Sequence, residues 1–145
     1  KIIKQNLKNY LILRPGWIFG SENTENKRVF EILMTRLILN QPLNLSDNQY
    51  ISPLYLRDLN KVLQKLIKDE KKGTINISNK GFCSAYEFFS YIKSNILSES
   101  KLIIKDYREF NENRSQSEKI YSKKIYLRHW KKAVNDYLLN LKSIS

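Results

Sequence analysis

The chain has 145 residues, enough for one domain or part of one, and its hydrophobic content of 41% excludes a chain that is disordered throughout. Its formal net charge is +12, and no apolar run approaches the roughly 20 residues that a membrane-spanning helix needs. We therefore expect a globular α/β protein that has no membrane partner.

Lysine supplies most of the positive charge, and the lysines are spread along the chain. Arginine is the better residue for bidentate contacts to phosphates and bases, so we interpret the excess charge as a solvated surface. A basic nucleic-acid-binding module is the alternative, and salt-dependent binding to DNA would support it. The single cysteine, Cys83, excludes an internal disulfide framework and favours a cytoplasmic protein.

The first predicted elements are a helix over residues 1–8 and a strand over residues 10–14. The strand is an apolar run that ends in Arg-Pro, which is typical of a buried parallel strand covered on both faces. Pro15 cannot continue the ladder and ends the strand. Ligands of open α/β sheets bind beyond the carboxyl ends of strands. Trp17 is therefore a candidate platform for a flat or sugar-like ligand.

The middle of the chain alternates between helical and strand patterns. After a polar loop over residues 21–26, the expected elements are a helix over 27–40, a short strand over 43–45, a helix from about 55 to 68, and a strand over 74–78. We expect Asp58 to cap the start of the second helix and Gly73 to cap its end.

The last third begins with Ser84-x-x-Glu87, a capping box that predicts a helix to about Leu97. Cys83 directly precedes this cap, where a thiolate could be stabilised. A strand over 102–104 and a polar loop over 109–118 follow. A final amphipathic helix is expected over 127–141, with His129 on its surface and with Trp130, Val134, Tyr137 and Leu138 facing inward. Alternating strands and helices predict an α/β unit with parallel pairing.

Three segments resemble, in order and spacing, the blocks of one enzyme family. The first is Arg14-Pro15-Gly16-Trp17-Ile18-Phe19-Gly20, similar to Arg-Thr-Ser-Trp-Val-Tyr/Phe-Gly. The second, from Asp47 to Leu59, resembles Asp-x-Gln-x-Gly-x-Pro-Thr-x-x-x-Asp-Leu. The third, from Gly73 to Phe88, resembles Gly-x-Tyr-His-x-Ser-Asn-x-Gly-x-x-Ser-Trp-Tyr-Glu-Phe. The family is the dTDP-4-dehydrorhamnose reductases, which are extended short-chain dehydrogenases.

The resemblance implies a fold and an activity. Residues 1–145 would be the C-terminal part of an NAD(P)-binding, Rossmann-like enzyme, with its small substrate-binding lobe and without the dinucleotide-binding half. The intact parent would use NADPH or NADH to reduce a dTDP-4-keto-6-deoxy sugar. The family's catalytic Tyr-x-x-x-Lys pair would lie upstream of Lys1. Neither that pair nor a Gly-x-x-Gly-x-x-Gly phosphate cradle occurs in this sequence, so we expect the fragment alone to be inactive.

The resemblance also implies site residues. Trp17 would lie against the substrate sugar, Gln49 and Ser52 would face the nucleotide sugar, and Arg114 would bind the diphosphate, with Arg108 as its rival. Pro15 and Gly16 would shape the backbone beside the nicotinamide ring, where the family usually has Thr-Ser. A core tryptophan and ordinary turn chemistry are the structural alternatives for Trp17 and Gln49. No catalytic residue and no metal site are expected within the chain.

Two rival functions remain within the same fold. One is a related nucleotide-sugar epimerase or reductase, although such relatives commonly lack the tryptophan of this loop. The other is a non-catalytic regulatory subunit. The expected partners are a dTDP-sugar substrate and, as an option, a second copy of the chain in a homodimer.

Overall fold

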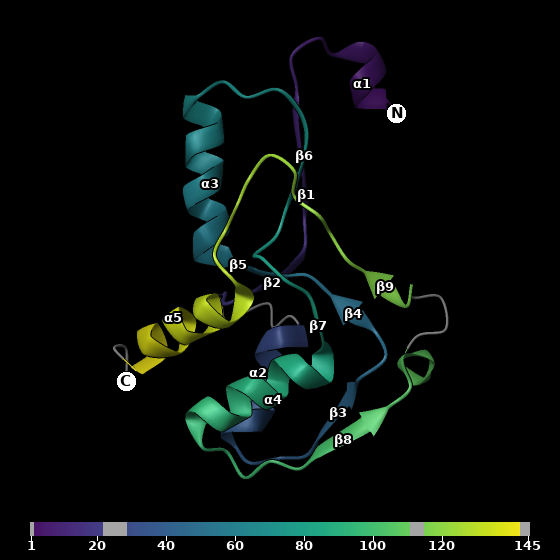
Figure 1. The fold of residues 1–145 in the computed structure, drawn as a ribbon, viewed down its shortest axis with the longest axis vertical. Helices are drawn as coiled ribbons and strands as arrows, with labels where there is room; N and C mark the ends of the chain where they lie inside the picture. The colour runs from purple at the N-terminus through teal and green to yellow at the C-terminus, as the bar shows by residue number, and fades with distance from the viewer. Residues whose placement is uncertain (1, 22–28, 111–114, 143–145) are drawn as a thin grey trace.

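The computed structural model describes residues 2–21, 29–110 and 115–142 (Figure 1). The helices and strands that the sequence predicts are present, and the structure adds five short strands and a 3-10 helix that the sequence does not predict. In chain order the elements are α1 (Ile2–Asn6), β1 (Leu11–Pro15), β2 (Trp17–Phe19), α2 (Val29–Ile38), β3 (Leu43–Ser46), β4 (Tyr50–Ile51), β5 (Pro53–Tyr55), α3 (Leu56–Lys68), β6 (Gly73–Ile77), β7 (Cys83–Ser84), α4 (Ala85–Ile96), β8 (Leu102–Lys105), the 3-10 helix η1 (Tyr107–Glu109), β9 (Ser117–Glu118) and α5 (Trp130–Lys142).

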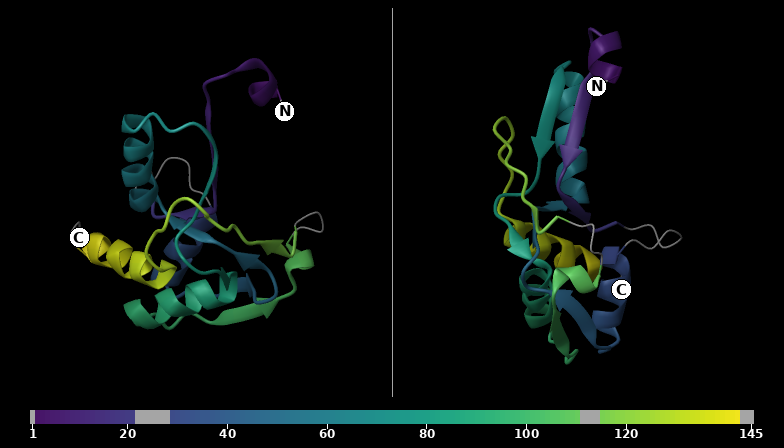
Figure 2. Two further views of the ribbon diagram at one scale, coloured as in Figure 1. Left: turned by 45° about the horizontal axis from the view of Figure 1, so that its top comes forward. Right: turned by 90° about the vertical axis from the view of Figure 1, so that its right-hand side faces the viewer.

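Parallel pairing dominates the strands, which confirms the predicted α/β class. Strand β1 pairs with β6, β2 with β5, and β3 with β8, and all three pairs are parallel. Strand β4 lies between β7, which is antiparallel to it, and β9, which is parallel. Figure 2 shows the β1–β6 pair extending away from the part of the molecule that contains α2, α4 and α5.

The burial predicted for β1 is wrong. Its first three residues are only half-buried, and Arg14 and Pro15 are exposed. In the described part of the chain β1 pairs with β6 alone, so its other edge and part of its surface stay open to solvent. Helix α3 runs alongside this pair (Figure 1), and the β6 residues Ile75 and Ile77 are buried.

An aromatic cluster forms the centre of the core. Phe19 from β2 packs against Phe30, Phe88 and Tyr137, and it stacks on Tyr55 at a centroid distance of 5.3 Å. Aromatic pairs of this geometry add to the free energy of burial. Helix α5 turns into this core the four residues that the sequence predicts, namely Trp130, Val134, Tyr137 and Leu138.

The capping box before α4 is confirmed. The Ser84 hydroxyl accepts a hydrogen bond from the Glu87 N–H at 3.0 Å, and the Glu87 carboxylate accepts one from the Ser84 N–H at 2.8 Å. Cys83 lies next to this cap but is buried, and burial followed by the nearby Glu87 raises the pKa of its thiol far above its usual value. The expected thiolate stabilisation is therefore wrong, because the group is held as a core thiol.

The predicted end of α3 near residue 68 is confirmed, but the predicted cap by Gly73 is wrong. The helix ends at Lys68 with Asp69 as its C-cap, and Glu70 then takes a left-handed φ of 47°. Gly73 starts β6 at a φ of 97°, a conformation that glycine adopts readily, so it serves the strand and not the cap. Of the polar loop predicted over residues 109–118, the described part contains the end of η1 and strand β9. Residues 22–26 of the earlier loop lie outside the described residues.

Candidate functional site

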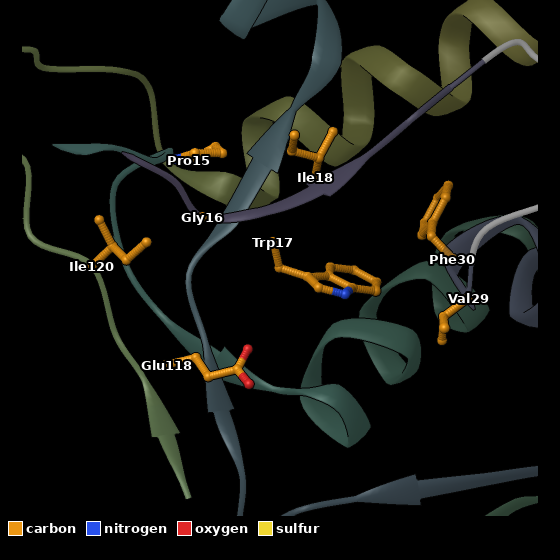
Figure 3. Close-up of a pocket in the computed structure, with 8 residues that line it drawn as sticks. All are labelled: Pro15, Gly16, Trp17, Ile18, Val29, Phe30, Glu118 and Ile120. Atoms are coloured by element: carbon orange, nitrogen blue, oxygen red, sulfur yellow. The ribbon is translucent and has the colours of Figure 1, made fainter. Parts of the chain in front are cut away.

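A pocket of about 370 Å³ opens at the carboxyl end of β1, where parallel sheets present their ligand sites. Its walls come from the β1–β2 connection, the start of α2, and the segment around β9 (Figure 3). The residues that line it are Pro15, Gly16, Trp17, Ile18, Val29, Phe30, Glu118 and Ile120. The pocket thus includes three of the residues that the sequence singles out, namely Pro15, Gly16 and Trp17.

The backbone at Gly16 passes from one pair of strands to the next. The Gly16 N–H donates to the Ile77 carbonyl and the Trp17 N–H donates to the Ser52 carbonyl, both at 2.8 Å. A Cβ on Gly16 would collide with the Ser52 carbonyl oxygen and would lie 3.2 Å from the Ser78 Cβ. Only glycine therefore lets the chain pass so close to Ser52 and Ser78 between β1 and β2.

Trp17 has one part of its ring in the core and another part at the pocket. Its indole packs edge-on against Phe88 and Phe30, with ring-centroid distances of 5.3 and 5.8 Å and nearly perpendicular ring planes. The side chain is nevertheless only half-buried, and it projects along the floor of the pocket in Figure 3. A ring that is fixed from one side and open on the other can serve as a rigid apolar surface for a ligand.

Residues 115–128, which we call the strap, cross the open ends of β4, β5 and β6. The Ile120 N–H donates to the Ser52 hydroxyl at 2.8 Å, and the Ser78 hydroxyl donates to the Ile120 carbonyl at 3.2 Å. The Gln49 side-chain amide donates to the Ser115 carbonyl at 2.9 Å. Glu118 and Ile120 of the strap then form one wall of the pocket.

Gln49 and Ser52 therefore lie behind the pocket wall. Gln49 is 8% exposed and Ser52 is 2% exposed, and neither is among the residues that line the pocket. Both side chains hold the strap in place, so they position the wall that a ligand would touch. Direct contact of these two residues with a nucleotide sugar stays a prediction.

The two arginines considered for a diphosphate are placed differently. Arg114 lies outside the described residues. Arg108 is exposed, and its guanidinium makes two hydrogen bonds to the Asp106 carboxylate at 2.9 and 3.0 Å. These bonds lower the pKa of Asp106 and raise that of Arg108, so Arg108 has a carboxylate partner. Arg108 is part of η1, and it does not line the pocket.

Glu118 is a pocket residue that the sequence does not reveal. Its carboxylate points into the space beside the Trp17 ring (Figure 3). In the sequence it stands within a polar stretch, Ser115-Gln116-Ser117-Glu118, which has no apolar alternation to mark β9 as a strand. Its place at the pocket follows from the pairing of β9 with β4, which joins Glu118 to Ile51.

A buried ion pair fastens the far end of the strap. The prediction that Asp58 caps α3 is wrong. Asp58 is 7% exposed, and its carboxylate accepts two hydrogen bonds from the Arg128 guanidinium, at 2.8 and 2.9 Å. Arg128 also pairs with Asp136 at 2.7 Å. The Asn79 amide donates to Asp58 at 2.8 Å and accepts from the Tyr55 N–H at 2.8 Å. One cluster thus joins α3, the end of β6, the strap and α5.

His129 is half-buried and directly precedes α5, so the prediction that it lies within the helix is wrong. Its Nδ1 accepts a hydrogen bond from the Lys131 N–H at 3.3 Å, and its backbone bridges to Lys80. The side chain therefore acts as a cap for the first turn of the helix. In the described residues no group of three or more His, Cys, Asp or Glu side chains is arranged to hold a metal ion.

The environment of His129 leads us to expect a lower free energy of unfolding in weak acid. Burial, then Lys131, Lys80 and Lys132, lower the pKa of His129 below its usual 6.5. The unfolded chain therefore binds more protons than the folded one as the pH falls through about 6.5, so the free energy of unfolding falls with pH. We expect urea unfolding to show lower stability at about pH 5.5 than at about pH 7.5.

The control for this prediction is His129→Asn, which keeps a side-chain acceptor before α5 but cannot take up a proton in this range. The chain has a single histidine, so the variant should show a weaker dependence of stability on pH between these two values. Equal pH dependence in the variant and the parent would contradict the role of His129.

No helix among residues 2–21, 29–110 and 115–142 combines the length and the hydropathy required to traverse a lipid bilayer.

Comparison with known proteins identifies the family. A model of the RmlD substrate binding domain matches residues 1–143. The spore coat polysaccharide biosynthesis protein SpsK of Bacillus subtilis (strain 168) is 26% identical, in an alignment that covers 95% of this chain and 50% of that protein. The chain thus spans about half the length of this curated relative.

Solved structures share the fold. A dTDP-4-dehydrorhamnose reductase from Bacillus anthracis str. Ames in complex with NADP has a TM-score of 0.80 at 22% identity, over 95% of this chain and 50% of that chain. A dTDP-4-dehydrorhamnose reductase from Clostridium acetobutylicum has a TM-score of 0.75 at 23% identity, over 97% of this chain and 51% of that chain. UDP-glucuronic acid 4-epimerase from Bacillus cereus in complex with UDP-glucuronic acid and NAD has a TM-score of 0.74 at 15% identity, over 97% of this chain and 48% of that chain.

These likenesses establish an α/β fold that corresponds to about half of a Rossmann-like extended short-chain dehydrogenase, as the sequence predicts. They also confirm the resemblance to dTDP-4-dehydrorhamnose reductases and related sugar-nucleotide enzymes. By its match over residues 1–143, the chain belongs to the RmlD substrate binding domain family.

Proposed function

We propose that this chain is the C-terminal, substrate-binding half of an NAD(P)H-dependent reductase that acts on a dTDP-4-keto-6-deoxy sugar. The observation that carries the proposal is the Trp17 pocket at the carboxyl end of β1. It combines the half-buried Trp17 ring, a backbone at Gly16 and Trp17 that is hydrogen-bonded to Ile77 and Ser52, and a wall supplied by the strap. The family match and the dTDP-4-dehydrorhamnose reductase folds support the same reading.

The pocket suits the sugar end of such a substrate. An indole ring offers an apolar face to the C–H bonds of a hexose, and Phe30, Ile18 and Ile120 add apolar surface around it. Gln49 and Ser52 would serve indirectly, since their hydrogen bonds fix the strap over the pocket. Direct nucleotide contacts by these two residues, and diphosphate binding by Arg114, remain part of the proposal.

The residues present fit only the nicotinamide end of a dinucleotide. Pro15 and Gly16 form a flat wall without a side-chain donor, and the tight packing at Gly16 keeps this wall in one position. No glycine-rich phosphate cradle occurs in the sequence, so the remainder of the cofactor would be held by a dinucleotide-binding half. When bound, the nicotinamide supplies the hydride. We further propose that residues 1–145 alone do not reduce a keto sugar, because the sequence contains no Tyr-x-x-x-Lys pair.

A related sugar-nucleotide epimerase is the second candidate, because UDP-sugar epimerases have the same fold. Trp17 favours the reductase, since related epimerases commonly lack a tryptophan in this loop. A non-catalytic subunit of the same fold would keep the pocket and bind the sugar nucleotide without turning it over. Cytoplasmic location and homodimer formation stay predictions.

The test is a titration of the chain with dTDP-glucose, followed by tryptophan fluorescence. Trp17 lines the pocket, whereas Trp130 is 4% exposed in the core, so a ligand in the pocket should quench Trp17 selectively. The Trp17→Phe variant should lose the signal and bind about tenfold more weakly by calorimetry, because a smaller ring covers less of the sugar. A quench that persists in Trp17→Phe, or no binding by the parent chain, would overturn the proposal.

A further inference from the structure

Among the residues that the structure describes, a single charged side chain lines the Trp17 pocket. Seven of the eight residues that line it are apolar or contribute backbone, and Glu118 is the only charged residue among them. A carboxylate in an otherwise apolar wall attracts hydroxyl donors and repels other anions. The pocket therefore has a built-in preference for uncharged groups.

The nearest cation in sequence does not neutralise this carboxylate. Lys119 follows Glu118 directly, but its Nζ lies 4.3 Å from the centre of the Tyr50 ring and 4.0 Å from that of Phe82. This cation–π contact holds the ammonium on the aromatic pair and away from the pocket. In the part of the chain that the structure describes, Glu118 has no ion pair.

The position of Glu118 is fixed by the strap on both sides. Strand β9 pairs in parallel with β4, which aligns Glu118 with Ile51. Two residues later, the Ile120 N–H is bonded to the buried Ser52 hydroxyl. These two attachments present the Glu118 carboxylate to the space beside the Trp17 ring, as Figure 3 shows. A charge held on backbone attachments of this kind can discriminate between ligands.

We propose that Glu118 is a specificity-determining residue, which selects a neutral, hydroxyl-bearing sugar and excludes sugars that carry a carboxylate. The inference rests on the proposed function, because it takes the pocket as the sugar site. The Glu118 carboxylate accepts hydrogen bonds from sugar hydroxyls on the ring that lies over Trp17. A uronic acid in the same place would bring a second carboxylate beside it, and the diphosphate is kept outside the pocket for the same reason.

The test compares two ligands that differ only at C6 of the sugar, dTDP-glucose and dTDP-glucuronic acid. The parent chain should bind dTDP-glucose about tenfold more tightly, and the preference should shrink as salt is added, because the Glu118 side chain is exposed to solvent. Glu118→Gln should reduce the preference to roughly twofold, since an amide neither repels a carboxylate nor loses the shape of the side chain. The control is Glu99→Gln, which removes the same charge from an exposed site between α4 and β8 and should keep the preference.

The outcomes separate the two proposals. Binding of both ligands with the same preference in the parent and in Glu118→Gln would overturn the role of Glu118 and leave the proposed function intact. Loss of preference in Glu99→Gln as well would show a general charge effect and would also overturn it. Binding of neither ligand by the parent chain would overturn the proposed function, and this inference with it.

Discussion

Replacing Arg128 with alanine should lower the free energy of unfolding by about 3 kcal/mol, because it leaves the buried Asp58 carboxylate without its cation. Asp58 is 7% exposed, and its two hydrogen bonds from the guanidinium are 2.8 and 2.9 Å long. The value is placed at the lower end for a broken buried pair because about a third of the Arg128 side chain is exposed. Urea unfolding followed by far-ultraviolet circular dichroism measures it.

Two variants control this experiment. Arg108→Ala removes an arginine from an exposed pair with Asp106 and should change stability little. Combining Arg128→Ala with Asp58→Asn should recover part of the loss, because the remaining buried group is then uncharged and can keep its bond to Asn79. If the double variant were less stable than Arg128→Ala by the full cost of Asp58→Asn alone, the two residues would not be coupled.

Replacing Gly16 with alanine should lower stability by about 2–3 kcal/mol and distort the Trp17 pocket. The added methyl group would meet the Ser52 carbonyl, which is itself bonded to the Trp17 N–H. Backbone cannot move aside as a side chain can, so β2 would have to shift away from β5. Urea unfolding gives the stability, and the tryptophan emission spectrum reports the displacement of the Trp17 ring.

Gly73→Ala is the matched control, because it separates backbone strain from crowding. Gly73 has a φ of 97° but open space where a Cβ would stand. Its replacement should cost about 1–2 kcal/mol and leave the tryptophan emission unchanged. If Gly16→Ala were as stable as the parent, with the same emission spectrum, the close approach of β2 to β5 would not depend on glycine.

Elements with a strong local pattern could be predicted from the sequence. The capping box at Ser84 and Glu87 is a signal contained within four residues, and the structure reproduces both of its hydrogen bonds. The inward face of α5 follows from helical spacing alone. Pro15, Gly16 and Trp17 reach the pocket because they lie where β1 ends and β2 begins, and the end of the apolar run at Pro15 is also a local pattern.

What the sequence does not reveal depends on contacts between distant segments. Ser52 looks like a turn residue until the strap reaches it at Ile120. Asp58 has the position of a helix cap, but a partner that comes 70 residues later gives it a buried ion pair. Strands β4 and β9 have two residues each, too few for any alternation, so Glu118 could not be placed at the pocket.

The parallel pairs have a consequence for how fast the chain folds. Leu11 is aligned with Gly73 and Leu43 with Leu102, so each of these pairs must close a long loop before it gains a single hydrogen bond. A two-residue hairpin cannot join parallel strands, and high contact order slows folding. Helices α3, α4 and α5 can form locally within microseconds. The Trp17 pocket forms only after β2 has paired with β5 and the strap has packed against them. We therefore expect the Trp17 pocket to be among the last parts of the molecule to form.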